Sequence, residues 1–222
     1  MMRKPIAVMF AVALCTSGMA QESKRLPEVK PNLHGWLLLP IPVGVPIFND
    51  VTETVGQLDL RFQMPLSKKG YGLGAGVKAS LFDLEENSLA PENIAGDVER
   101  WTFYGQAQYE RYTGPRTYYQ LAAQFGTSQY TWSCATCAEP TRQQGFFWGL
   151  NASYYLHATD NLAFGVMVGY EQDAARMTPQ QLCLDGYPGR TDNGPSAHYG
   201  YLTAGLGFST RFMRSPDAGP GW

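Results

Sequence analysis

The stretch NLAFGVMVGYEQD, from Asn161 to Asp173, decides the fold class because apolar residues alternate along it with small or polar ones. A period of two residues places alternate side chains on opposite faces of a β-strand. One face is apolar throughout: Leu162, Phe164, Val166, Val168 and Tyr170. The other face carries Ala163, Gly165, Met167, Gly169 and Glu171. The segment is predicted to be a strand whose apolar face contacts either a protein core or lipid.

The first twenty residues have the features of a cleaved secretion signal. Arg3 and Lys4 precede an apolar stretch from Ile6 to Leu14, and the small residues of SGMA favour cleavage after Ala20. Residues 21–32 then form a flexible lead-in to the remaining chain. The protein is therefore predicted to leave the cytoplasm.

The composition after cleavage indicates one domain and a barrel if the chain crosses a membrane. About 200 residues remain, which fits one domain. Without Arg3 and Lys4 the chain has 15 basic and 19 acidic side chains, so nothing suggests nucleic acid as a partner. The longest apolar run, WLLLPIPVGVPIF, is broken by three prolines and cannot form a spanning helix. Only helices and closed barrels satisfy their backbone polar groups in lipid.

Eight segments have the length and alternation of membrane-spanning strands, which cross with about 9 to 11 residues. They are residues 33–45, 55–65, 71–82, 100–112, 116–130, 145–157, 161–173 and 198–212. Only the first alternates irregularly, because of its prolines.

The second face of these segments favours lipid outside and a polar interior. It is dominated by Gln, Asn, Ser, Thr, Tyr and Gly, whereas a soluble barrel with an apolar interior would carry charges outside. Glycine is useful inside a narrow barrel, where large side chains of neighbouring strands need room. Aromatic girdles at the membrane boundaries are expected from residues near the strand ends: Tyr71, Trp101, Tyr119, Trp148, Tyr154 and Tyr199. A soluble periplasmic sandwich or ligand-binding barrel is the main rival fold.

The connections alternate between short turns and mostly long polar links, as in bacterial outer-membrane barrels. With these features the chain resembles the small eight-stranded outer-membrane barrels, the group that includes the OmpA transmembrane domain, OmpX and OmpW. The resemblance is one of architecture, covers residues 33–212, and includes an aromatic, Phe212, near the end of the final strand. It implies an all-β, antiparallel, up-and-down barrel in the outer membrane of a Gram-negative bacterium. A short tail, residues 213–222, follows, and the barrel assembly machinery would read either Phe212 or Trp222.

Charged residues on the inward face are expected to pair inside the lumen, because buried charges are tolerated when they are paired and hydrogen-bonded. They are Asp59, Arg61, Lys78, Glu110, Glu171 and Arg211. An eight-stranded barrel has room for its own side chains and little else. A plugged lumen is therefore favoured over a narrow or gated channel for ions or small solutes.

Catalytic and metal sites receive little support. The three histidines are His34, His157, which is near Asp160, and His198, which is near Ser196. A nucleophilic site would need a serine, a histidine and an orienting acid within reach of one another. No motif indicates this, so a lipid-modifying enzyme is only the second alternative, and no cofactor or metal is expected.

The outer loops are predicted to carry the cysteines and any recognition. Cys134, Cys137 and Cys183 fall in an oxidising compartment, where one disulfide is expected, either Cys134 with Cys137 or one of them with Cys183. The loop 83–99 is acidic, and the loop 174–197 mixes arginines with acids and could dock a partner or a surface polysaccharide. We expect a structural, adhesive or partner-binding role, with outer-membrane lipid or lipopolysaccharide around the barrel and an envelope or surface protein as a further partner.

Overall fold

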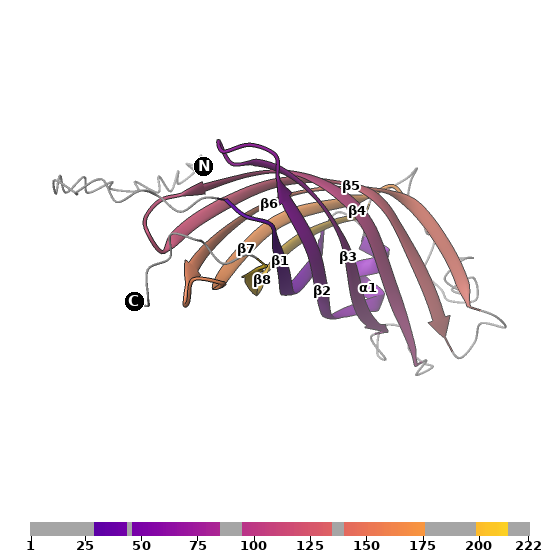
Figure 1. The fold of residues 1–222 in the computed structure, drawn as a ribbon. Coiled ribbons are helices and arrows are strands. Elements are labelled where there is room, and N and C mark those ends of the chain that lie inside the picture. Colours follow the sequence, from indigo (N-terminus) through magenta and orange to yellow (C-terminus); the bar gives the residue numbers. More distant parts are fainter. Residues whose placement is uncertain (1–28, 44–45, 85–94, 135–139, 176–198, 213–222) are drawn as a thin grey trace, which may run out of the picture.

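The computed structural model describes residues 29–43, 46–84, 95–134, 140–175 and 199–212 as a closed barrel of eight antiparallel strands (Figure 1). Each strand pairs with its neighbours in sequence, and the last pairs with the first. The strands are β1 Asn32–Val43, β2 Thr52–Pro65, β3 Tyr71–Leu84, β4 Gly96–Tyr112, β5 Thr117–Cys134, β6 Thr141–His157, β7 Leu162–Asp173 and β8 Tyr199–Arg211. The predicted eight-stranded up-and-down barrel is confirmed. No helix among the described residues is long and apolar enough to cross a membrane.

The two ends of the barrel differ. At one end, which we call the turn end, residues 66–70, 113–116 and 158–161 join the strands in short turns. The opposite loop end has the longer connections, the first of which contains a helix, α1 Pro46–Val51. β4, β5 and β6 are the longest strands, with 17, 18 and 17 residues, and their additional residues lie mostly at the loop end.

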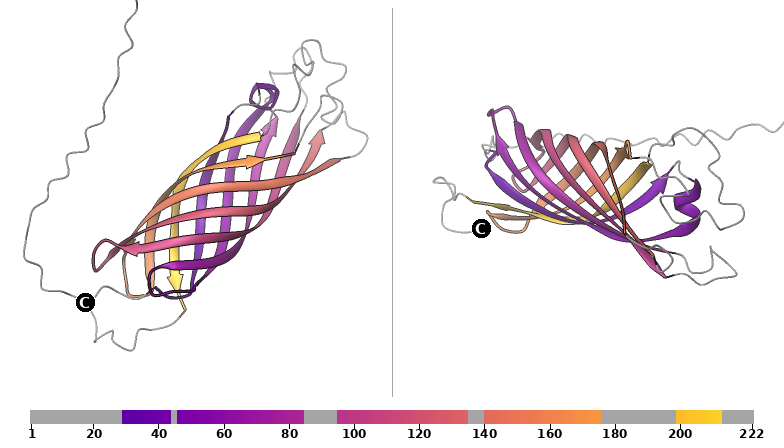
Figure 2. Two further views of the ribbon diagram at one scale, coloured as in Figure 1. Left: turned by 90° about the horizontal axis from the view of Figure 1, so that it is seen from above. Right: turned by 90° about the vertical axis from the view of Figure 1, so that its right-hand side faces the viewer.

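The strand register produces a strong tilt, visible as oblique strands in Figure 2. From Asn32, cross-strand partners lead in turn through Gln63, Gly74, Gln106, Gln124, Gly149, Glu171 and Tyr201. Tyr201 pairs with Pro42, so one circuit of the barrel returns to β1 ten residues beyond Asn32. Closure with such a stagger requires tilted strands and leaves an interior just wide enough for side chains.

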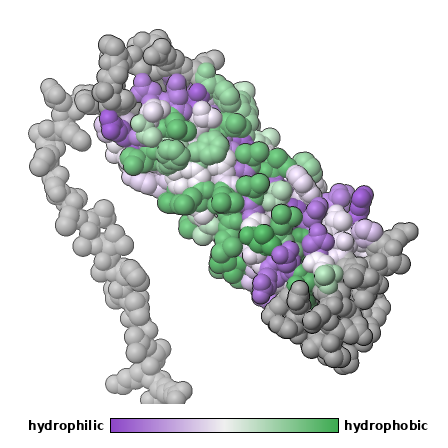
Figure 3. Space-filling view, turned by 90° about the horizontal axis from the view of Figure 1, so that it is seen from below, coloured by the Kyte–Doolittle hydropathy of each residue, from purple (hydrophilic) through white to green (hydrophobic). Residues whose placement is uncertain are grey.

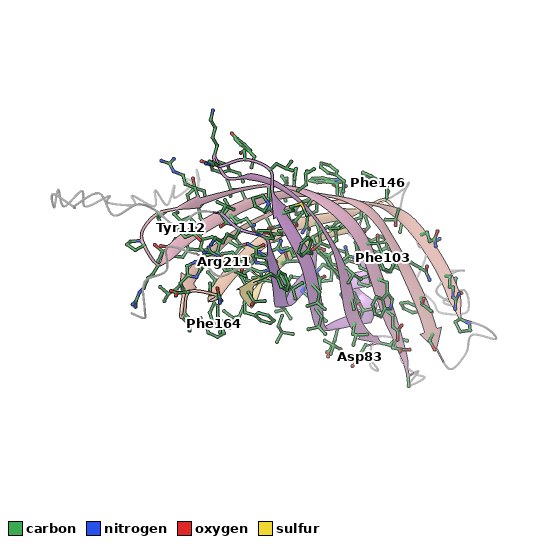
Figure 4. All side chains as sticks on the ribbon, in the orientation of Figure 1. Asp83, Phe103, Tyr112, Phe146, Phe164 and Arg211 are labelled. Carbon is green, nitrogen blue, oxygen red and sulfur yellow. The ribbon has the colours of Figure 1, made fainter. Side chains whose placement is uncertain are left out.

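The outer wall is apolar and the interior is polar. The exposed side chains of the wall include Leu58, Leu73, Phe103, Leu121, Phe146, Leu150, Phe164 and Leu206. Figure 3 shows a hydrophobic belt on the face in view, with hydrophilic residues toward both ends of the barrel. Figure 4 shows Phe103, Phe146 and Phe164 on the outside of the barrel. Glycines inside make room for large neighbours: a Cβ at Gly76 would lie 2.5 Å from the hydroxyl oxygen of Tyr104. The wall therefore suits lipid, and the polar groups are enclosed.

Candidate functional site

The interior encloses four acidic and four basic side chains among the described residues. Of the six predicted lumen residues, Asp59, Arg61, Lys78, Glu110 and Glu171 are buried, and Arg211 is half-buried at the turn end. Arg100 and Asp173 are also fully buried, and the sequence prediction omitted them. The positive and negative charges of this set balance. The eight residues form three separate groups along the barrel axis.

The group nearest the loop end is a closed ion-pair network of two cations and two carboxylates. The carboxylate of Glu171, on β7, contacts the ammonium of Lys78 on β3. Nη1 of Arg100, on β4, lies 3.0 Å from Oε2 of Glu171. Nε of Arg100 lies 2.9 Å from Oδ2 of Asp173. Because each charge has an opposite charge in contact, the network lowers the cost of burying all four.

Neutral groups complete this network. Gln57 donates to Oε1 of Glu171 at 3.2 Å, and Lys78 donates to Oε1 of Gln124 at 2.7 Å. The hydroxyl of Tyr130 donates to Oδ2 of Asp173 at 2.6 Å. The Arg100 guanidinium also lies over the ring of Tyr201, 4.7 Å from its centroid. The network thereby ties strands from opposite sides of the barrel together.

The middle group contains Asp59 and Arg61, which the structure does not bring into an ion pair. The hydroxyl of Tyr104 donates to Oδ1 of Asp59 at 2.5 Å. Arg61 instead donates to Oδ1 of Asn151 at 3.2 Å and lies over the indole of Trp36. Within the described residues, no carboxylate oxygen is within 4.0 Å of the Arg61 guanidinium. The single network predicted from the sequence is therefore divided.

Aromatic rings close the barrel at the turn end. The rings of Tyr118 and Tyr155 stack with centroids 4.5 Å apart, and the Tyr155 hydroxyl lies 2.5 Å from Nδ1 of His34. Figure 4 shows Arg211 and Tyr112 at this end, where the guanidinium lies over the Tyr112 ring and Nη2 is 3.1 Å from Nε2 of His157. Glu110 is buried nearby, and neither of its carboxylate oxygens has a hydrogen bond within the described residues.

An apolar cap closes the loop end. Phe48 and Val51 of α1 are fully buried, and the Phe48 ring meets those of Phe82 and Tyr199 edge to face, with centroids 5.2 and 5.3 Å apart. The complete cap consists of Phe48, Val51, Phe82, Leu84, Val98, Tyr130, Trp132, Ala175, Tyr199 and Tyr201. Tyr199 was expected in an outer girdle, but it is only 2% exposed because α1 packs against it. The helix itself was not predicted, although Phe48 and Val51 have the spacing that brings two side chains onto one helical face.

Other predicted sites lie wholly or partly outside the described residues. Cys137, Cys183 and His198 are outside them, as are the signal segment 1–20 and the tail 213–222, and Cys134 is described only as the last residue of β5. The disulfide therefore stays a prediction. Neither His34 nor His157 is hydrogen-bonded to a serine hydroxyl in the described part of the chain. That part also holds no cluster of three or more His, Cys, Asp or Glu residues suited to a metal ion.

Comparison with known proteins finds relatives in fold only. No protein-family model and no curated protein matches the sequence. Neisserial surface protein A superposes with a TM-score of 0.50 and 10% identity over 84% of this chain and 99% of that one. OprG from Pseudomonas aeruginosa gives 0.45 with 11% identity over 84% and 98%, and Ail of Yersinia pestis gives 0.44 with 11% identity over 82% and 99%. The chain has the fold of the small eight-stranded outer-membrane barrels, as the resemblance predicted.

Proposed function

We propose that this chain is a sealed barrel of a Gram-negative outer membrane that presents a binding surface outside the cell. The fold and the apolar belt support the location. By the usual arrangement of such barrels, the turn end lies in the periplasm and the loop end outside. The role is then structural, adhesive or partner-binding, and an envelope or surface protein is the expected partner.

Three obstacles inside the lumen support the proposal that the barrel is sealed. The apolar cap fills the loop end, the ion-pair network crosses the barrel below it, and the stacked rings fill the turn end. An ion would have to pass all three obstacles. Most of the cap is hydrocarbon, and the hydroxyls of Tyr130 and Tyr201 are already hydrogen-bonded to each other, with Tyr130 also bonded to Asp173. The structure therefore favours an anchor over the alternative of a narrow or gated channel.

We expect the mature protein to show no ion conductance in planar bilayers, because the apolar cap, the ion-pair network and the stacked rings obstruct the lumen. A change in gel mobility on heating should first establish that the protein is folded. Arg61→Gln and Glu110→Gln, which remove interior charges, should leave the baseline unchanged. Reproducible current steps that respond to either substitution would instead support the channel.

The loop ends of β4, β5 and β6 provide the binding surface. Their outward side chains change from apolar below Trp101 and Phe146 to polar above them: Asp97, Glu99, Gln129, Thr131, Ser133, Arg142 and Gln144. Each is exposed or half-buried. An outward polar face does not suit lipid, so we infer that these strand ends project beyond the membrane.

Cysteine labelling of intact cells tests this orientation. In a chain whose native cysteines are replaced by serine, Ser133→Cys should react with a membrane-impermeant maleimide. Thr113→Cys, which is also exposed but lies in a turn, should react only after the outer membrane is permeabilised. The reverse pattern would invert the proposed orientation, and labelling of neither residue by any route would contradict their exposure.

A further inference from the structure

We propose that the turn end and the adjoining outer wall bind one anionic phospholipid of the periplasmic leaflet. Its phosphate would lie at Lys68, Lys69 and Arg111, and one of its acyl chains would occupy a groove that climbs the wall. The inference rests on the membrane location and orientation proposed above. Two adjoining cavities of different chemistry carry it.

The first cavity is basic and lies at the turn end. It has a volume of about 580 Å³ and is lined by Val29, residues 65–70 and residues 109–112. Lys68, Lys69 and Arg111 are exposed, and none of the three forms an ion pair within the described residues. Glu110 is the one acid in the lining, and its side chain is buried at 1% exposure. The accessible charge of this cavity is therefore positive, which suits a phosphate.

The second cavity is a groove in the lipid-facing wall, with a volume of about 770 Å³. Its floor is formed by the outward alanines Ala107, Ala123 and Ala152 on β4, β5 and β6, and larger residues such as Leu121, Leu150 and Val168 flank it. Ala107 and Ala123 are direct cross-strand partners. Ala123 pairs with Leu150, two residues from Ala152, so the shallow region continues diagonally from β5 to β6. Such a groove accepts hydrocarbon, and its lining has no charged side chain to bind a charged headgroup.

The two cavities meet at Tyr109, which lines both. Tyr71 stands beside it, with ring centroids 5.2 Å apart. From Tyr71 at the start of β3 the groove crosses to Leu202 near the loop end of β8. Five strand spacings of about 4.8 Å make this path about 24 Å long. Because the path runs obliquely to the barrel axis, it rises by roughly 15 Å along that axis. This is about the depth of the hydrocarbon in one leaflet.

The charges at the two ends of the barrel indicate which leaflet of the membrane supplies the lipid. Among the described residues, the exposed charged side chains at the loop end are mainly acidic, namely Glu53, Asp83, Asp97 and Glu99, with Arg142 as a base. A phosphate is attracted to the turn end and repelled by the acids of the loop end. The fitting ligand joins an anionic headgroup to an acyl chain that extends away from the periplasm, which describes an anionic phospholipid and not an outer-leaflet lipid.

Native mass spectrometry of the full mature protein tests the proposal, with phosphatidylglycerol and phosphatidylcholine of identical acyl chains as probes. One phosphatidylglycerol should be held in preference to phosphatidylcholine. The triple variant Lys68→Gln, Lys69→Gln and Arg111→Gln should lose about a hundredfold of that preference, because each cation near a membrane surface contributes about a fivefold factor. Arg142→Gln, at the loop end, should retain it.

The groove is tested separately by Ala123→Phe with Ala152→Phe, which should weaken retention of both lipids. Ala79→Phe is the matched control, since Ala79 faces outward on β3 but does not line the groove. Equal retention of the two lipids by the wild-type protein would overturn the proposal. So would displacement of phosphatidylglycerol by inorganic phosphate at the same concentration, because the site would then recognise a free anion.

Membrane partition and heat-dependent gel mobility of the same samples separate this inference from the proposed function. A wild-type chain that stays soluble without detergent and shows no mobility shift would refute both. A folded, membrane-embedded barrel without lipid preference would refute the lipid site alone.

Discussion

Replacement of Glu171 by glutamine should lower the free energy of unfolding of the barrel by about 3–5 kcal/mol, the range for removing one partner of a buried ion pair. The substitution retains the shape of the side chain but removes the charge that both Lys78 and Arg100 contact. Arg100 keeps Asp173, whereas Lys78 loses its only carboxylate contact among the described residues. Urea unfolding in lipid vesicles, followed by gel mobility, measures the change.

Two controls show whether burial is responsible for the loss. Asp83→Asn removes an equal charge from an exposed position at the loop end and should cost less than about 1 kcal/mol. Lys78→Met combined with Glu171→Leu should recover part of the loss, since an apolar pair often replaces a buried ion pair at little cost. A Glu171→Gln barrel as stable as the wild-type barrel would contradict the network described here.

Phe48→Ala should release α1 from the loop end while the strands below stay paired. Removing a buried phenylalanine costs about 3–5 kcal/mol, and a six-residue helix has little stability of its own without such packing. Hydrogen exchange should become fast at the amides of residues 49–51 and stay slow in the middle of β2. Emission of Trp132, which is buried in the same cap, should shift to the red relative to the wild-type protein.

Leu81→Ala is the matched control, because Leu81 is a large side chain next to Phe82 that faces outward. It should leave exchange in α1 unchanged. If Phe48→Ala lowered protection equally in α1 and throughout the barrel, the cap would be part of one cooperative unit and the prediction of local release would be wrong.

The barrel could be predicted because its determinants repeat along the chain. Alternation in eight segments identified the strands, and the chemistry of the inward face distinguished a lipid-exposed wall from a solvated one. β1 was the irregular segment because of its prolines. Pro40 and Pro42 lie beyond the last β1–β2 pair, Leu38 with Gln57, and the Pro40 carbonyl accepts from Thr54 at 2.9 Å on that side. Because Pro40 and Pro42 lack their N–H groups beyond the paired part of β1 and β2, β1 loses little hydrogen bonding.

The interior could be predicted by composition but not by pairing. Alternation placed side chains on the inward face. Continuing the inward positions by one more residue of the alternation, at the loop ends of β4 and β7, would have included Arg100 and Asp173. Which charges touch depends on the stagger, because it sets the height of each strand relative to the others. Asp59 and Arg61, two residues apart on β2, contact different residues on other strands, Tyr104 and Asn151, and Glu171 meets two cations. No local pattern encodes which strands supply these partners.

The cap shows the same limit. The segment 46–54 falls in the first of the links that the sequence predicts to be mostly long and polar, whereas the six residues of α1 are helical. Their apolar face is buried against side chains of β3 and β8, including Phe82 and Tyr199. A helix this short depends on tertiary packing for stability, so it becomes predictable only once the barrel is known.

The ion-pair network also sets an order for assembly of the barrel. Lys78 and Arg100 are synthesised 93 and 71 residues before Glu171, which must neutralise them. A chain that has placed β3 and β4 but not β7 carries two cations whose counter-charges have not arrived. Insertion strand by strand into lipid would leave these charges uncompensated. The network therefore favours a nascent chain that keeps its first six strands in a polar environment until β7 arrives, so that these charges are neutralised before β8 closes the barrel against β1.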